Sequence, residues 1–178
     1  MAHVMLDLET WGVKPGAALR SIGAVCFDPR TGALGDTFYV NIQDESCLRA
    51  GLTRDPGTVA WWADQSPEAR KALEEDPHPL GAALSLFSQW WTSVRGVYVW
   101  GHGASFDPVL LEAAYGAALT EPPWKFWNIR CCRTVLALAP HDTPDPEGYV
   151  KHNALDDAKA QALRVSAVFA ATKLVPEA

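Results

Sequence analysis

Three apolar segments near the start of the chain, separated by short polar turns, restrict its fold more than any other feature. Their composition and spacing predict β-strands over residues 3–9, 19–27 and 36–42, joined as hairpins. Residues 28–32 supply the turn between the second and third strands. The first three strands are therefore expected to pair antiparallel.

The rest of the chain is expected to alternate between helices and strands. Helices are predicted for residues 59–62, 69–74, 80–94, 106–118, 134–138 and 153–173, and a strand for residues 97–100. A Pro- and Trp-rich connection (residues 121–130) and a polar loop (residues 140–148) complete this order. The pattern predicts an α/β fold, whose mixed sheet continues parallel after the antiparallel strands and carries helices on both faces. Without a repeat or a linker, residues 1–178 are expected to form one domain.

Charge and cysteine usage narrow the classes of function. A net charge of −6 argues against a protein that coats long stretches of duplex, but it permits an enzyme that holds only a few nucleotides. From the pattern of the sequence we expect neither a signal peptide nor a membrane-spanning segment. The four cysteines have no disulfide or zinc-finger spacing, so we expect reduced thiols, a cytoplasmic location and no membrane partner.

Two acids follow each other at an interval of two residues on the first predicted strand. Asp7 and Glu9 should point to the same face of the strand, whereas Leu6 and Leu8 point to the other. Two carboxylates on one buried face repel each other, and a divalent cation such as Mg²⁺ or Mn²⁺ would compensate them. The alternative is that the strand ends here and that water solvates both acids.

Asp107 lies where a predicted strand gives way to a predicted helix. An acid in the first turn of a helix is commonly only a favourable charge against the helix dipole, so this residue alone indicates no site. Gly101 and Gly103 begin a G-x-G-x-x-G pattern, but Phe106 stands at its third glycine, which excludes a Rossmann site. Ser105 lacks the G-x-S-x-G surroundings of a hydrolase nucleophile.

A histidine at the end of the polar loop precedes the last predicted helix. His152 is followed by Asp157 one turn into this helix, where Ala158 and Ala162 can pack inward while the acid reaches a shared pocket. A histidine followed by acids is more often an ordinary start of a surface helix. The segment therefore becomes informative only together with the other acids.

Taken in order along the chain, the three motifs resemble those of the DEDDh exonuclease superfamily, which includes proofreading exonuclease subunits and RNase T. They are D-x-E at residues 7–9, F-D at 106–107 and H-x-A-L-x-D-A at 152–158. The resemblance implies an RNase H-like fold and a 3′→5′ exonuclease. The W-G-x-G-A-S-F-D sequence at 100–107 is most similar to a small bacterial and phage branch with exonuclease-VIII-like and exoribonuclease domains. This branch often has asparagine where the chain has His102.

The resemblance also implies roles for the site residues. Four acids would bind two divalent cations, Mg²⁺ or Mn²⁺, about 4 Å apart: Asp7, Glu9, Asp107 and Asp157. Asp7 would bridge the two ions, Glu9 and Asp157 would favour the ion that holds the attacking water, and Asp107 the other. His152 would act as the general base, with His102 as the competing candidate.

Substrate contacts are expected beside these acids. The backbone of Thr10, Trp11 and Gly12 is expected to cradle the terminal sugar, and aromatic side chains to stack on terminal bases. The aromatic candidates are Trp11, Trp61, Trp62 and Phe106, and His102 is a further contact. The expected partner is a single-stranded 3′ end or a 3′ overhang, with RNA slightly favoured over DNA by the branch resemblance alone. Because related enzymes often dimerise, the resemblance also suggests a homodimer.

Three alternatives to this function stay open at the level of sequence. The first is a DNA-specific 3′→5′ exonuclease. The second is a non-catalytic nucleic-acid-binding module, which would have no need of four acids and a histidine. The third is a phosphatase or nucleotide pyrophosphatase, which would act on free nucleotides and ignore oligomers.

Overall fold

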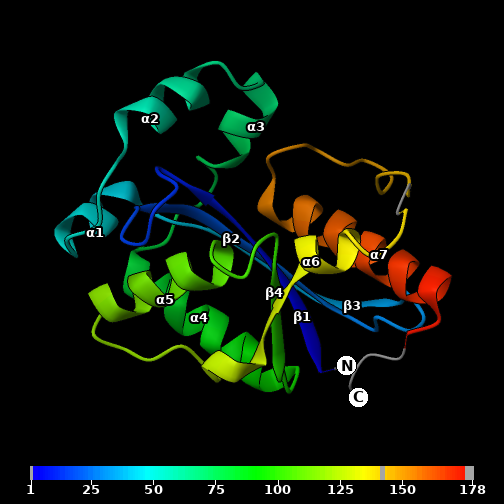
Figure 1. The fold of residues 1–178 in the computed structure, drawn as a ribbon. Helices are drawn as coiled ribbons and strands as arrows, with labels where there is room; N and C mark the ends of the chain where they lie inside the picture. Colours follow the sequence, from blue (N-terminus) through cyan, green and yellow to red (C-terminus); the bar gives the residue numbers. More distant parts are fainter. Residues whose placement is uncertain (1, 141–142, 175–178) are drawn as a thin grey trace.

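A computed structural model describes residues 2–140 and 143–174 as a five-stranded sheet with helices on both faces (Figure 1). The strands lie in the order β3-β2-β1-β4-β5. β1 pairs antiparallel with β2 and parallel with β4, β2 pairs antiparallel with β3, and β4 pairs parallel with β5. Their bounds are β1 His3–Thr10, β2 Leu19–Phe27, β3 Leu34–Asn41, β4 Tyr98–Gly101 and β5 Ile129–Cys131. The mixed α/β sheet predicted from the sequence is confirmed.

The two faces of the sheet carry separate apolar clusters. Val4, Leu6 and Leu8 of β1 face the first cluster, in which the helices α4 (Leu80–Ser93) and α5 (Asp107–Ala117) pack. Met5 faces the second cluster, which α6 (Cys132–Leu136) and α7 (Ala154–Thr172) cover. Because side chains alternate along a strand, the odd-numbered positions of β1 all lie on the side of α7.

Three short helices form the part of the chain between β3 and α4: α1 (Asp44–Arg49), α2 (Pro56–Ala63) and α3 (Pro67–Ala72). α2 and α3 lie beyond the carboxyl end of β1, where they stand apart from the two helical layers (Figure 1). The indole Nε1 of Trp62 donates a 2.9 Å hydrogen bond to the backbone oxygen of Thr10, which joins α2 to the end of β1. Among the described residues, no helix is both long and apolar enough to cross a bilayer.

The predicted elements differ from the observed ones mainly in two short segments. α1 was not predicted, and β5 lies at the end of a stretch expected to be a connection, after a 3₁₀ turn over Phe126–Asn128. Both are too short to have a recognisable period, and β5 is defined by its pairing with β4. α6 begins two residues earlier than predicted, because Cys132 is buried against α7 and belongs to the helix.

Candidate active site

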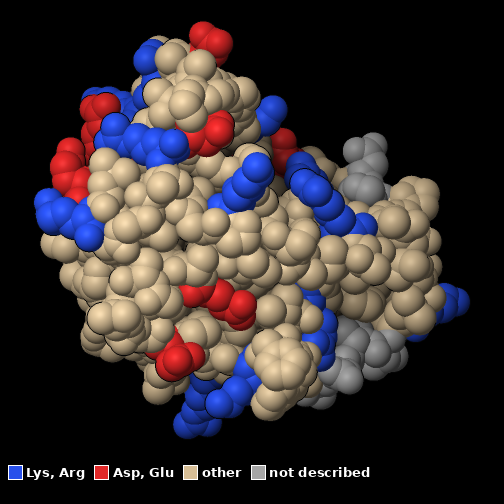
Figure 2. Space-filling model, turned by 60° about the vertical axis from the view of Figure 1, so that its left-hand side comes forward, with Lys and Arg blue, Asp and Glu red and all other residues tan. Residues whose placement is uncertain are grey.

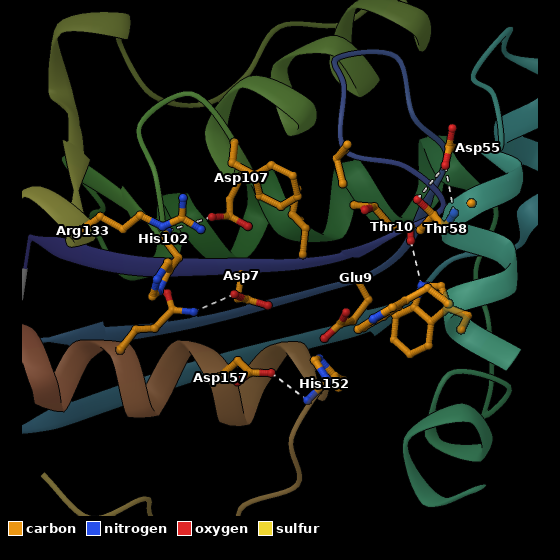
Figure 3. Close-up of a pocket in the computed structure, with 17 residues that line it drawn as sticks. Asp7, Glu9, Thr10, Asp55, Thr58, His102, Asp107, Arg133, His152 and Asp157 are labelled. Carbon is orange, nitrogen blue, oxygen red and sulfur yellow. Dashed lines mark hydrogen bonds between the residues drawn. The ribbon is translucent and has the colours of Figure 1, made fainter. Parts of the chain in front are cut away.

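A cavity of about 510 Å³ opens at the carboxyl ends of β1 and β4, between α7, α2 and the start of α5 (Figure 3). All but two of the residues predicted for the site line it. These are Asp7, Glu9, Thr10, Trp61, Trp62, His102, Phe106, Asp107, His152 and Asp157. Four separate parts of the chain therefore bring acids, imidazoles and aromatic rings to one place.

Asp7 lies on β1 and faces α7, as its odd-numbered position on the strand requires. Figure 3 shows its carboxylate above Asp157, with Asp107 on its other side. Burial raises the pKa of Asp7 well above its usual range, and the charges of Asp107, Glu9 and Asp157 raise it further. The amide of Gln161 opposes this rise by donating a 2.7 Å hydrogen bond to Asp7 Oδ1.

Glu9 lies two residues further along the same face of β1. Burial raises its pKa to about 8, the charge of Asp157 adds to the rise, and the charge of Arg20 opposes it. The Arg20 guanidinium lies between two indole rings, 4.0 Å from the ring centroid of Trp11 and 4.3 Å from that of Trp62. Contact with the rings on both sides keeps this cation beside Glu9.

Asp107 is the first residue of α5 and is 1% exposed. Its Oδ2 accepts a 2.8 Å hydrogen bond from the backbone N–H of His102, while burial raises its pKa to about 7. A Cβ on Gly101 would come within 2.9 Å of Asp107 Oδ2, and Gly103 has a φ of +144° that side chains rarely permit. The two glycines of the G-x-G pattern therefore allow the turn that aims Asp107 at the cavity.

His152 reaches the cavity through a left-handed turn with a φ of +64°. Its backbone N–H donates a 2.9 Å hydrogen bond to Asp157 Oδ2, so the acid holds the turn that carries the histidine. Asn153 caps α7 by accepting from the backbone N–H groups of the second and third helical residues. Burial lowers the pKa of the imidazole, and the charge of Asp157 opposes that effect.

The acids form a donor set that fits divalent cations. One ligand atom each from Glu9, His152 and Asp157 lie within 4.8 Å of one another, so the His152 imidazole lies directly beside these two acids. Asp7 and Asp107 complete the acidic lining beside this group. Burial raises the pKa of Asp7, Glu9 and Asp107, and neighbouring acids raise those of Asp7 and Glu9 further. Such buried carboxylates need a positive partner, and oxygen-rich sets of this kind suit Mg²⁺ and Mn²⁺.

Several residues of the cavity were not predicted from the sequence. Gln161 lies one turn after Asp157 on α7, and this i, i+4 spacing on a known site helix is a signal that could have revealed it. Tyr149 does not line the cavity, but its hydroxyl donates a 2.6 Å hydrogen bond to Asp157 Oδ1. Arg133 lines one end of the cavity and Thr58 the other, and neither belongs to a recognisable motif.

Two predicted substrate contacts lie outside the cavity. Trp11 packs against the core and its ring lies near two guanidinium groups, those of Arg20 and Arg54, the second at 5.4 Å. Gly12 is buried, and its carbonyl oxygen accepts a 2.7 Å hydrogen bond from the Thr10 hydroxyl. Trp11 and Gly12 therefore do not line the cavity, and their contact with a terminal nucleotide stays a prediction.

The two adjacent tryptophans of α2 differ in exposure. Trp62 is buried and directs its N–H to the backbone of Thr10. Trp61 is 44% exposed, and its ring meets that of His152 edge-to-face, with 4.8 Å between the ring centroids. Trp61 therefore offers an accessible face at the cavity, whereas Trp62 supports the wall behind it.

Comparison of the sequence with known proteins gives two matches. The family model of the Rv2179c-like 3′-5′ exoribonuclease domain matches residues 2–169. An exodeoxyribonuclease of Enterobacteria phage T4 is 28% identical over 197 aligned residues, which cover 88% of this chain and 84% of that protein. The family match bears out the resemblance to 3′→5′ exonucleases that the three motifs carry.

Solved structures resemble the fold. E. coli exonuclease I, in complex with a dT13 oligonucleotide, matches 94% of this chain with a TM-score of 0.66 and 16% sequence identity. The chain spans 40% of the length of that protein. Exonuclease X, in complex with 5′ overhanging duplex DNA, matches 97% of this chain and 94% of its own, with a TM-score of 0.60 and 16% identity. These likenesses confirm the fold class.

Proposed function

Because the chain belongs to the family of Rv2179c-like 3′-5′ exoribonuclease domains, and so is a 3′→5′ exonuclease, we propose that it degrades single-stranded 3′ ends or short 3′ overhangs to nucleoside 5′-monophosphates. In this proposal RNA is slightly favoured, in line with the family's description. A DNA-specific exonuclease is the second candidate, which the likeness to the phage exodeoxyribonuclease favours. All four cysteines are free, which suits the cytoplasmic location that the proposal includes.

One observation carries the proposal. Four carboxylates from three separate elements meet a histidine in one cavity, although burying them together raises the pKa of at least three of them. A fold gains no stability from such an arrangement without cations, so the cluster is best explained by a function. Asp7, Glu9, Asp107 and Asp157 would hold two divalent ions, Mg²⁺ or Mn²⁺.

The chemistry needs a nucleophile, a base and control of charge. Bound divalent ions would supply hydroxide from water near neutral pH and would stabilise the charge on the leaving oxygen. His152 would accept the proton of the attacking water, because its lowered pKa keeps the imidazole neutral near pH 7. Asp157 holds the His152 backbone, and the Trp61 ring packs against the imidazole, so the base is positioned from two sides.

The shape of the cavity supports a direction for the substrate. Thr10, Thr58 and Trp61 lie at its α2 end, while His102 and Arg133 lie at the opposite end, with the acids between them (Figure 3). We assign the 3′-terminal nucleotide to the α2 end, where the exposed Trp61 ring can stack on a base. The strand would then leave past Arg133, whose cation suits an upstream phosphate.

A direct test uses matched 5′-labelled RNA and DNA oligonucleotides of one sequence, incubated with Mg²⁺, with Mn²⁺ or with chelator. We expect a descending ladder and released 5′-monophosphates with either metal, with RNA degraded faster. A terminal 3′-phosphate should block the reaction. Asp157→Asn is the inactive control, because it removes one carboxylate of the cluster.

Other outcomes of this test separate the alternatives. Faster degradation of the DNA oligonucleotide than of the RNA would favour the DNA-specific exonuclease. Cleavage of a circular single strand at a comparable rate would remove the exonuclease proposal. Binding of both oligomers without release would indicate a non-catalytic module, and hydrolysis of free nucleotides alone would indicate a phosphatase or pyrophosphatase.

A further inference from the structure

A segment next to the cavity has a charge balance unlike the rest of the chain. Residues 122–140 contain no Asp or Glu, although the whole chain has 21 acids and a net charge of −6. The same segment carries three cations, which are Lys125, Arg130 and Arg133. It includes the edge strand β5, the 3₁₀ turn before it and α6 after it.

Two large aromatic side chains are exposed on this segment. Phe126 is 75% exposed and Trp127 is 62% exposed, and their ring centroids lie 4.9 Å apart in an edge-to-face arrangement. Neighbouring exposed rings are uncommon on a surface that contacts only water, because they leave apolar area unburied. Their faces are accessible to planar groups such as nucleobases.

Basic side chains connect these rings to the cavity. Arg130 Nη1 donates hydrogen bonds to the backbone oxygens of Trp127 (2.9 Å) and Ile129 (3.2 Å), and its guanidinium lies 4.5 Å from the ring centroid of Tyr98. Arg133 is exposed, lines the cavity and makes no ion pair or side-chain hydrogen bond within the described part of the chain. A backbone of phosphates could therefore pass from one cation to the next.

The strand pairing fixes the direction of this path. β5 lies parallel to β4 in the register Val99–Ile129 to Gly101–Cys131, so its carboxyl end reaches the cavity beside His102. The three residues of β5 span about 10 Å at roughly 3.3 Å per residue, and Phe126–Asn128 lies before the other end. A single strand that leaves past Arg133 would thus follow the sheet edge towards the two rings.

Acidic residues restrict the path to one side of the rings. A depression of about 470 Å³ on the α5 side of Phe126 is lined by Glu112 and Glu121, which repel phosphates. Figure 2 shows a face of the molecule on which charged side chains are few over much of the area. Lys and Arg side chains lie at the lower edge of this face. Charge complementarity therefore favours the side that carries Arg130 and Arg133.

We propose that Phe126, Trp127, Arg130 and Arg133 form a second binding track for the single strand upstream of the cut, which deepens and rests on the proposed exonuclease function. The rings would stack on bases without reading their sequence, while the two arginines contact phosphates. The track makes the enzyme prefer long single strands over very short ones. It holds the substrate between successive cuts without taking part in the chemistry.

The test compares the double variant Phe126→Ala/Trp127→Ala with the wild type on single-stranded oligomers of 2 and 12 nucleotides. We expect KM for the 12-mer to rise about tenfold, a typical loss for base stacking, with the dinucleotide KM and both kcat values unchanged. Leu34→Ala is the matched control, because Leu34 is a 36% exposed apolar residue on β3, the opposite edge strand. Thermal melts check that both variants fold.

A second measurement keeps this test independent of catalysis. Fluorescence anisotropy in chelator measures binding of a labelled 12-mer to both proteins, and we expect weaker binding by the double variant. If the wild type releases no nucleotides, the proposed function fails, but the anisotropy still tests the track. Equal binding and an equal KM for both lengths would overturn the track. A shift from dimer to monomer in sedimentation, with an unaltered 12-mer KM, would instead show that the rings join two copies of this chain.

Discussion

The side-chain amide of Gln161 on α7 donates a 2.7 Å hydrogen bond to Asp7 Oδ1 on β1, across 154 residues of sequence. The same amide leaves its Oε1 buried and without a hydrogen-bond partner among the described residues. Gln161 therefore gives its donor to an acid at the centre of the cluster and leaves its own acceptor unsatisfied. This relationship ties the last helix to the first strand at the centre of the candidate site.

Replacing Gln161 tests whether this contact orients Asp7. Residues that hydrogen-bond to metal ligands set the orientation of those ligands. Gln161→Leu should therefore raise the Mg²⁺ concentration that gives half-maximal activity by about 10–100-fold. Titration of activity with Mg²⁺ measures this effect. Gln89→Leu, on the exposed side of α4, is the control and should leave the titration unchanged. An unaltered half-saturating Mg²⁺ concentration in Gln161→Leu would remove Gln161 from the site.

Asp107→Asn should abolish hydrolysis while it stabilises the metal-free protein. Burial raises the pKa of Asp107 to about 7 and that of Glu9 to about 8, so the folded state binds more protons than the unfolded state from about pH 4 upward. Stability without metal should therefore fall as pH rises from about 4 to 8. Thermal melts in chelator should show this fall, and Asp107→Asn should make it shallower. A wild-type melting temperature that rises across this window would contradict the prediction.

His152→Ala should reduce the rate by about 10²–10⁴-fold with little effect on metal binding. The wild-type rate should increase with pH as the imidazole loses its proton, with a midpoint below the ordinary histidine pKa, since burial lowers the pKa of His152. The pH–rate profile of the variant should lose this limb. His102→Asn is the control and should keep the pH–rate profile of the wild type. If His102→Asn loses the pH-dependent rise and His152→Ala keeps it, His102 is the general base.

Removing or exchanging the metal should separate binding from turnover. Chelator should stop hydrolysis, and Mg²⁺ or Mn²⁺ should restore it. Ca²⁺ should bind the buried acids and so raise the melting temperature. It should support little hydrolysis, because its looser coordination orients water and phosphate poorly. Full activity in chelator would eliminate the two-metal proposal.

Gly23→Ala should disturb the site from a distance. A Cβ at Gly23 of β2 would lie 2.2 Å from the backbone carbon of Ala154, at the start of α7. The clash should cost about 1–3 kcal/mol of unfolding free energy and displace Asp157, which lowers activity. Gly81→Ala is the matched control: its Cβ meets no atom within 4 Å, and on α4 it should stabilise by about 0.5–1 kcal/mol. Denaturant unfolding beside activity assays measures both, and an unchanged Gly23→Ala protein would refute the close approach.

The local features of the fold could be predicted because each depends on neighbours in sequence. The period of two along β1 put Asp7 and Glu9 on one face, and the last helix, predicted over residues 153–173, is observed as α7 at Ala154–Thr172. The three motifs identified the exonuclease resemblance that the family match bears out. These properties need no knowledge of which strands pair.

The remaining properties were decided only by tertiary contacts. The guanidinium of Arg20 packs against the rings of both Trp11 and Trp62, and Trp11 does not line the cavity although it follows the D-x-E motif. Gln161 meets Asp7 only because α7 crosses the face of β1. The sequence alone determined which residues carry charge and on which face of an element they lie. Which of them meet depended on packing between elements distant in sequence, where the burial free energy of the whole core outweighs local preference.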